Sequence, residues 1–224
     1  MPLISPARLA AVAVFALALP VQAQAEPWGS VAGKTTPTAR HENGFVEVEG
    51  RFYLLGGRGD RPLEVFDPAT REWTTRAAPP LGLHHVQAIA FDGKLLVVNA
   101  LAGDFPEETP LDRVLIYDPA TVRWSDGPVI PAERRRGAGG VVVHQGLIYV
   151  IGGNSRGHMS GYVPWLDVLD PATGQWAALA DAPHARDHFH AAVIDGRIYA
   201  AGGPRSSHDT GQGGELKGGA AGGY

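Results

Sequence analysis

The sequence FDPATREW at residues 66–73 returns as YDPATVRW at 117–124 and as LDPATGQW at 169–176, and this repeat is the main indication of the fold. The tryptophans that end the three copies are 51 and 52 residues apart. Asp-Pro favours a type I turn, because aspartate suits the first position of that turn and proline the second. Each copy therefore predicts a tight turn between two strands.

A second block recurs between these copies. It begins with a two-residue hairpin signal that ends in glycine, at 49–50, 92–93, 145–146 and 195–196. An apolar run follows and ends in Gly-Gly at 56–57, 152–153 and 202–203, whereas the second repeat has Asn99-Ala100 there. A unit of about 50 residues with four short strands is typical of β-propeller blades, which bury their faces against neighbouring blades. We expect the periodic tryptophans to pack between blades.

The composition agrees with an all-β fold and excludes several functional classes. The 224 residues include 30 Gly and 18 Pro, which are poor helix formers and good turn formers. The chain has no Cys, which excludes disulfides, cysteine-ligated metals and a thiol nucleophile. A formal net charge of −4 argues against nucleic-acid binding.

Together the two blocks resemble the kelch repeat: an apolar strand and Gly-Gly, then an aromatic or apolar residue before Asp-Pro, then Trp. The resemblance covers residues 26–203. It implies a kelch-type β-propeller of four-stranded antiparallel blades, with strand A innermost and strand D outermost. Kelch repeats support many functions, so the resemblance does not define an activity.

The repeat positions predict blades over 41–80, 81–131 and 132–183, and a partial fourth over 184–203 that a strand from 26–33 completes. Because propellers have roughly four to eight blades, we expect an incomplete propeller with three full blades and a split fourth, as in a truncated copy of a longer protein. The alternative is a four-bladed ring with a defective last blade. The glycine-rich residues 204–224 are expected to form a disordered tail.

The N-terminus has the layout of a secretory signal peptide. Arg8 precedes an apolar run at 9–19, and small residues precede Ala25. The run is shorter than the roughly 20 residues of a membrane span. We expect cleavage near Ala25 and a periplasmic or extracellular protein with no membrane span.

The candidate binding residues gather on one face, where the D–A and B–C loops meet at the mouth of the central channel. Alignment on the hairpin glycines places Arg136 and Arg186 in one column, and it places His85 and His188 in a later column together with Asn43. The long B–C loops, which also carry Phe105, are where function usually lies. The candidates for ligand binding are His84, His85, Gln87, Arg134, Arg135, Arg136, His158, Trp165, Arg186, Asp187, His188 and His190.

The same residues also fit structural roles. Polar groups that line a channel often bind ordered water, the arginines can pair with Glu133, and Trp165 can pack under its own loop. His188 and His190 point the same way and could hold a metal with His84 or His85. Because the sequence fixes no carboxylate partner for them, we expect no metal and no cofactor.

The leading hypothesis is an exported kelch-repeat binding protein that recognises a small ligand, such as a carbohydrate, or a partner protein. The alternative is an enzyme, because similar exported kelch propellers act as sialic-acid mutarotases. In that case Arg136, Arg186, His188 and Glu107 or Glu108 would hold a carboxylate and transfer a proton. Copper-radical oxidases of the galactose oxidase type share the fold but need a cysteine, so that activity is excluded. The intracellular adaptor class fits poorly with an export signal.

Overall fold

The structure, a computed structural model, describes residues 29–203 and 222–223. The chain divides into two compact units, Met1–Val31 and Ala32–Tyr224. Of the first unit only residues 29–31 are described, and they are exposed and lack secondary structure. The predicted signal peptide, Trp28 and nearly all of the predicted tail lie outside the described residues. Within the described ranges there is no α-helix, and no helix long and apolar enough to span a membrane.

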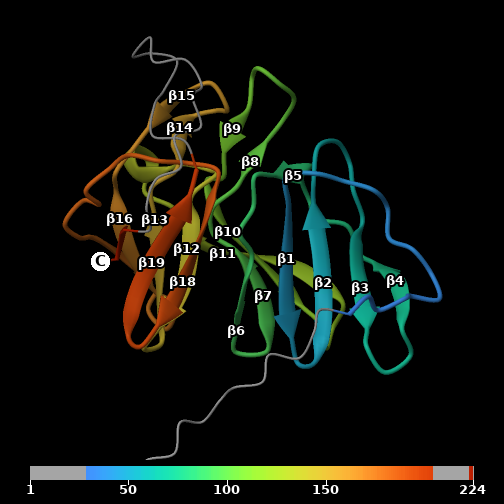
Figure 1. The fold of residues 1–224 in the computed structure, drawn as a ribbon. Helices are drawn as coiled ribbons and strands as arrows, with labels where there is room; N and C mark the ends of the chain where they lie inside the picture. Colours follow the sequence, from blue (N-terminus) through green and yellow to red (C-terminus); the bar gives the residue numbers. More distant parts are fainter. Residues whose placement is uncertain (1–28, 204–221, 224) are drawn as a thin grey trace, which may run out of the picture. The chain divides into compact units, whose positions relative to one another are not determined.

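Four-stranded antiparallel sheets form the body of the second unit (Figure 1). The strands of the first sheet follow chain order: β1 (Asn43–Val48), β2 (Arg51–Gly56), β3 (Leu63–Asp67) and β4 (Glu72–Arg76). The second sheet contains β6 (Ile89–Phe91), β7 (Lys94–Val97), β10 (Arg113–Asp118) and β11 (Arg123–Val129). The third contains β12 (Gly140–His144), β13 (Leu147–Ile151), β16 (Leu166–Asp170) and β17 (Gln175–Ala178).

The fourth repeat contributes β18 (Phe189–Ile194), β19 (Arg197–Gly202) and the two-residue β20 (Gly222–Gly223), which pairs with β19. The predicted all-β fold, with three four-stranded antiparallel blades and an incomplete fourth, is confirmed. Residues 29–33, the described end of the segment expected to complete the fourth blade, form no strand.

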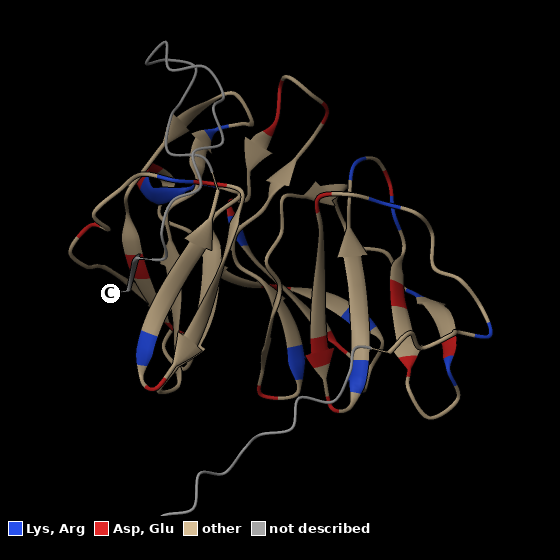
Figure 2. Cartoon of the chain, viewed as in Figure 1, with Lys and Arg blue, Asp and Glu red and all other residues tan. Residues whose placement is uncertain are grey.

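The long B–C loops and the connections between blades carry small elements of their own. Strands β5 (Leu83–His84), β8 (Leu101–Ala102) and β9 (Thr109–Pro110) form a small sheet. Strands β14 (Asn154–Arg156) and β15 (Ser160–Tyr162) form a hairpin, and one 3-10 turn, η1 (Ala132–Arg134), precedes the third blade. Figure 2 shows most charged residues at strand ends and in these loops.

Both predicted turn signals are confirmed. At the A–B hairpins the non-glycine residue has φ between 49° and 51° and its glycine between 67° and 78°, as a type I′ turn requires. At the Asp-Pro turns the aspartate side chain accepts a hydrogen bond from the amide two residues later, at 2.9, 2.8 and 2.9 Å in the three copies. The residue before strand D is then left-handed in each copy: Arg71 (φ 60°), Val122 (φ 55°) and Gly174 (φ 73°).

The core consists of three apolar clusters, one at each interface between neighbouring repeats. Each cluster contains residues from two neighbouring repeats: Leu55 and Val97 belong to the first, Val98 and Ile148 to the second, and Ile151 and Ala191 to the third. Trp124 and Trp176 pack against these clusters, and the Trp124 indole donates a hydrogen bond to Ala77 O, in the connection from the first repeat, at 2.9 Å. The predicted packing between blades is confirmed for these two tryptophans, whereas Trp73 stacks against Phe66 of its own sheet and belongs to none of the three clusters.

A buried arginine holds the entry to strand A in three of the repeats. Arg136 donates to Gly152 O at 2.6 Å and to Val150 O at 2.9 Å, and it pairs with buried Asp167 at 2.7 Å. In the first repeat Arg40 bonds Gly56 O, the counterpart of Gly152 O, as well as Pro62 O, and it pairs with Glu64.

The second repeat has leucine at both corresponding positions. Leu83 replaces the arginine and Leu115, three residues before Asp118, replaces the acid; both are buried in one apolar cluster. Arginine and acid are thus exchanged together for an apolar pair within a single chain.

Substitution of Val122 tests the backbone strain at the Asp-Pro turns. A β-branched residue in the left-handed region costs about 1–2 kcal/mol, and glycine costs roughly 0.5–1 kcal/mol in chain entropy. We expect Val122→Gly to raise the free energy of unfolding by about 0.5–1 kcal/mol. The matched reverse change, Gly174→Val, should lower it by a similar amount, about 0.5–1 kcal/mol, since its Cβ would meet nothing closer than 3.5 Å and only the backbone is strained. Urea denaturation measures both; shifts of the same sign would contradict this account.

The exchange of charged and apolar pairs can also be tested. Arg136→Leu leaves buried Asp167 with Arg134, at 2.9 Å, as a remaining partner and should cost about 1.5–3 kcal/mol in unfolding free energy. The double variant Arg136→Leu/Asp167→Leu copies the second repeat and should recover at least about 1 kcal/mol of that loss, because packed apolar residues can replace a buried ion pair without loss of stability. Chemical denaturation of the two variants gives both values. A double variant less stable than the single one would show that the pair is not exchangeable.

Candidate functional site

Four left-handed residues, one from each repeat, begin the innermost strands: Glu42 (φ 57°), His85 (φ 56°), Ala138 (φ 58°) and His188 (φ 50°). Their backbones are joined in sequence. His85 N donates to Glu42 O at 2.8 Å, Ala138 N to His85 O at 3.3 Å, and His188 N to Ala138 O at 2.8 Å. We call these four residues the backbone ladder. The sequence alignment placed Asn43 in this column; the backbone shows that Glu42 occupies it.

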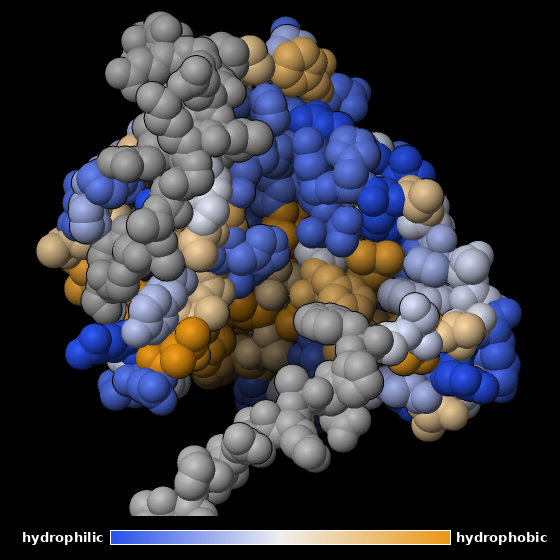
Figure 3. Space-filling view, in the orientation of Figure 1, coloured by the Kyte–Doolittle hydropathy of each residue, from blue (hydrophilic) through white to orange (hydrophobic). Residues whose placement is uncertain are grey.

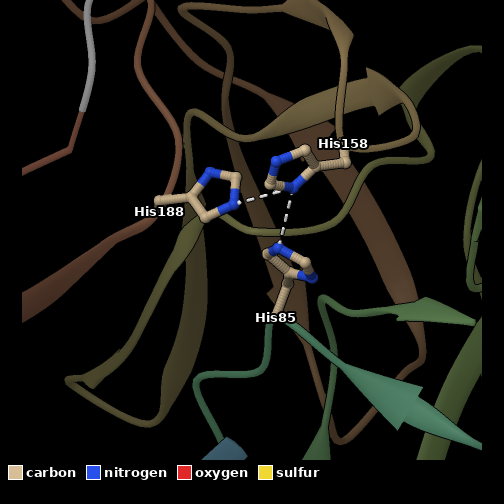
Figure 4. A group of neighbouring side chains, drawn as sticks. All are labelled: His85, His158 and His188. Atoms are coloured by element: carbon tan, nitrogen blue, oxygen red, sulfur yellow. Dashed lines mark hydrogen bonds between the residues drawn. The ribbon is translucent and has the colours of Figure 1, made fainter. Parts of the chain in front are cut away.

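The ladder brings two histidines together with a third from the β14–β15 hairpin (Figure 4). His158 Nδ1 lies 3.1 Å from His85 Nε2 and 3.2 Å from His188 Nε2. We call His85, His158 and His188 the histidine cluster. One ring nitrogen of each residue therefore points to a common centre.

Neighbouring groups determine which nitrogen of each ring carries the proton. His188 Nδ1 lies 3.0 Å from Asp187 Oδ2, so Nδ1 is the donor and a neutral ring has its lone pair on Nε2. His84 Nε2 lies 2.9 Å from Gly103 O and must donate to it. A neutral His84 ring then accepts at Nδ1 from His85 Nδ1, 2.6 Å away, which leaves the lone pair of His85 on Nε2.

The surroundings of His85 and His158 keep both rings in the neutral form. Burial, followed by repulsion from His188, His84 and His158, lowers the pKa of His85 from 6.5 to about 2. Burial and the neighbouring His188 also lower the pKa of His158. Both rings are therefore uncharged at neutral pH and offer lone pairs.

Besides Asp187, two acids and one arginine border the cluster. Glu42 Oε1 lies 3.4 Å from His85 Nε2, and its other oxygen lies 2.6 Å from Arg58 Nε. Arg58 also binds Glu108 through Nη1 at 2.7 Å, and Glu108 Oε2 accepts a hydrogen bond from the His158 backbone amide. Arg58 thus fixes both carboxylates, one of which faces the histidine cluster.

A recess of about 170 Å³ opens beside the cluster. Its polar lining comes from the starts of three innermost strands, with Phe189 as an apolar wall: Glu42, Asn43, His85, Gln87, His188 and His190. Gln87 has a structural role there as well, because Oε1 accepts from Val141 N and Ala191 N, both at 3.0 Å, and thereby joins three repeats. Hydrophilic residues gather around the loops above the apolar strands (Figure 3).

The structure divides the candidate residues predicted from sequence into three groups. His85, Gln87, His158, His188 and His190 lie in the histidine cluster or line the recess. His84 and Asp187 are buried behind the cluster and orient its rings. The third group is bound to other parts of the scaffold: Arg134, Arg135, Arg136, Trp165 and Arg186.

The contacts of this third group leave little for a ligand. Arg186 is 3% exposed and donates to Ala200 O and Gly202 O, as Arg136 does in its own repeat. The guanidinium of Arg134 lies 4.3 Å above the Trp165 ring and its Nε donates to Asp167. Arg135 donates to Ile130 O at 3.2 Å.

The list of ligand-binding candidates lacked four residues that border the site: Glu42, Arg58, Phe105 and Glu108. Phe105 had been noted in its long B–C loop, and Glu108 had been named for the enzyme alternative. Phe105 is 55% exposed, and its ring centre lies 6.1 Å from that of His158. Glu42 was missed because Asn43 was assigned to its place, although Glu42 stands eight residues before Gly50 as His85 does before Gly93. Arg58 was missed because its B–C loop is short.

Comparison with known proteins gives consistent matches. The Kelch motif family model matches residues 135–183. The chain is 30% identical over 178 residues to Kelch-like protein terF of Aspergillus terreus, covering 73% of this chain and 39% of that protein. It is 28% identical over 178 residues to alpha-scruin of Limulus polyphemus, covering 75% of this chain and 19% of that protein. The chain therefore spans well under half the length of these relatives.

A solved structure, that of YjhT, matches with a TM-score of 0.62 at 18% identity and covers 73% of this chain and 59% of that one. At this identity the match supports the fold alone. The repeated Asp-Pro turns, the four-stranded sheets and these matches agree, and the chain belongs to the kelch-repeat family.

Proposed function

We propose that this chain is an exported kelch-repeat binding protein whose recess takes a small, neutral, hydroxyl-rich ligand such as a sugar. The observation that carries the proposal is the backbone ladder, which gathers polar side chains from three repeats around a cavity of about 170 Å³. Pockets for drug-sized ligands are larger, roughly 300–1,000 Å³. The recess therefore suits a ligand the size of a single sugar ring.

The charges around the recess favour a neutral ligand. Glu42, Glu108 and Asp187 border the recess or the histidine cluster, whereas Arg58 is the cation that pairs with the first two. The local charge is thus negative when the imidazoles are neutral, and an anionic sugar would be repelled. Carboxylate, amide and imidazole groups are suitable partners for hydroxyls.

The enzyme alternative has less support. A mutarotase acting on an anionic sugar would need free arginines at the channel mouth, but Arg136 and Arg186 are buried and bonded to backbone carbonyls. Kelch repeats are generally protein-interaction modules, so a protein partner is the remaining alternative. A recess of this size holds a sugar better than a folded partner.

Phe105 offers the sharpest test of sugar binding. An exposed aromatic ring beside polar groups is suited to stack on a sugar face. Saturation-transfer NMR with a panel of neutral monosaccharides and with sialic acid should show binding of a neutral sugar only. Phe105→Ala should raise the Kd for that sugar about 5–10-fold, as expected for the loss of roughly 1–1.4 kcal/mol of ring contact.

Phe45 provides the matched control, because it is 53% exposed but lies on β1 with its ring stacked on Phe52. Phe45→Ala should leave sugar binding unchanged. If the folded protein binds none of these sugars, or if both variants weaken binding equally, the proposal is wrong and a protein partner becomes the better hypothesis.

Export can be tested independently of the ligand. We expect a C-terminally tagged full-length chain to appear in the periplasm or the medium, with an intact mass that starts at Glu26. The physical reason is the charged, apolar and small-residue order of residues 1–25. An unprocessed product confined to the cytoplasm would refute export and leave the binding proposal untouched.

A further inference from the structure

We propose that His85, His158 and His188 form a binding site for a divalent transition metal, best suited to zinc, with a fourth position open to a water oxygen. This goes beyond the proposed sugar binding and does not depend on it. The sequence alone led us to expect no metal, because no carboxylate partner was fixed. The structure replaces His190 by His158 and places Glu42 beside His85 but outside the group of ligand atoms that the three histidines form.

The spacing of the ring nitrogens fits tetrahedral coordination. Two ligands at about 2.0–2.1 Å from zinc in a tetrahedral arrangement lie about 3.3 Å apart. The observed separations are 3.1 Å for His85–His158 and 3.2 Å for His188–His158. One ligand atom from each histidine lies within 4.8 Å of the others.

The outer shell is also that of a metal site. Ligating histidines generally donate their other ring N–H to a carboxylate, a carbonyl or another acceptor, which fixes the ring and its tautomer. His188 Nδ1 has buried Asp187 as its acceptor, and His85 Nδ1 has His84, which in turn donates to Gly103 O. Arg58 holds one oxygen of Glu42 and leaves the other beside the cluster.

Hydrogen bonds among the three rings cannot satisfy all the nitrogens that face one another. The Nε2 lone pairs of His85 and His188 both face His158 Nδ1, which carries at most one proton. A single N–H cannot make two good hydrogen bonds at once, whereas a cation at the common centre accepts all three lone pairs. The His188 side chain is 28% exposed, so the centre is accessible from solvent.

The chemistry of the ligand atoms indicates which metal the site would bind. Imidazole suits zinc, copper, iron and nickel, and a three-nitrogen, one-oxygen tetrahedral set is typical of zinc. The absence of cysteine removes the softer ligands that would favour Cu(I).

The test is zinc titration of the full chain after EDTA treatment, by calorimetry with a competing chelator. We expect one zinc per chain. His158→Ala should weaken zinc binding by about 100-fold or more, beyond the roughly 10–100-fold expected when the outer-shell partner is lost in Asp187→Asn. His144→Ala, at the outer end of β12, is the matched control and should bind zinc as the wild type does.

X-ray absorption of the zinc-loaded wild type keeps the test valid even if a variant fails to fold. We expect nitrogen-dominated first-shell scattering at about 2.0–2.1 Å. No stoichiometric zinc binding by the folded chain, equal binding by wild type and a folded His158→Ala variant, or oxygen-only coordination would each overturn the proposal. Sugar titration of the metal-free protein in EDTA tests the sugar site separately, so a failure of zinc binding can be told apart from a failure of sugar binding.

Discussion

Three backbone hydrogen bonds link the starts of the innermost strands, from Glu42 to His85, from His85 to Ala138 and from Ala138 to His188. They require a left-handed residue at the same place in each repeat, and all four residues adopt that conformation although none is glycine. Local strain of this kind persists only where the surrounding structure holds it. Its consequence is functional, because the side chains of distant repeats are directed toward one recess.

The buried arginines and the Gly-Gly pairs hold this ladder in place. A Cβ on Gly152 would lie 2.6 Å from Arg186 O, and one on Gly56 would lie 2.6 Å from Leu83 O. The backbones of neighbouring repeats therefore approach each other closely at these positions, because glycine has no side chain. The arginine side chains then bond the carbonyls beside these glycines, as with Arg136 and Gly152. These contacts explain why residues that look like ligand-binding arginines in the sequence act as structural groups.

Much of the fold was predictable because its signals are local. Glu49-Gly50 and Asp67-Pro68 define turns by their own backbone preferences, and the spacing of the tryptophans gives the repeat. The site was only partly predictable. His85 and His188 were aligned correctly, but the short first loop hid Arg58, and the neighbouring Glu42 was displaced by one position. Whether an arginine faces solvent or a carbonyl depends on packing between repeats, which the sequence pattern does not encode.

The network around the histidine cluster turns the lone pairs of two rings toward one point. Long-range nitrogen–proton NMR of labelled, metal-free protein at neutral pH measures this directly. We expect Nδ1 to be the protonated ring nitrogen of His85 and of His188, and Nε2 that of His84. A proton on Nε2 of His85 or of His188 would contradict this arrangement, because the lone pair of that ring would then not face the common centre.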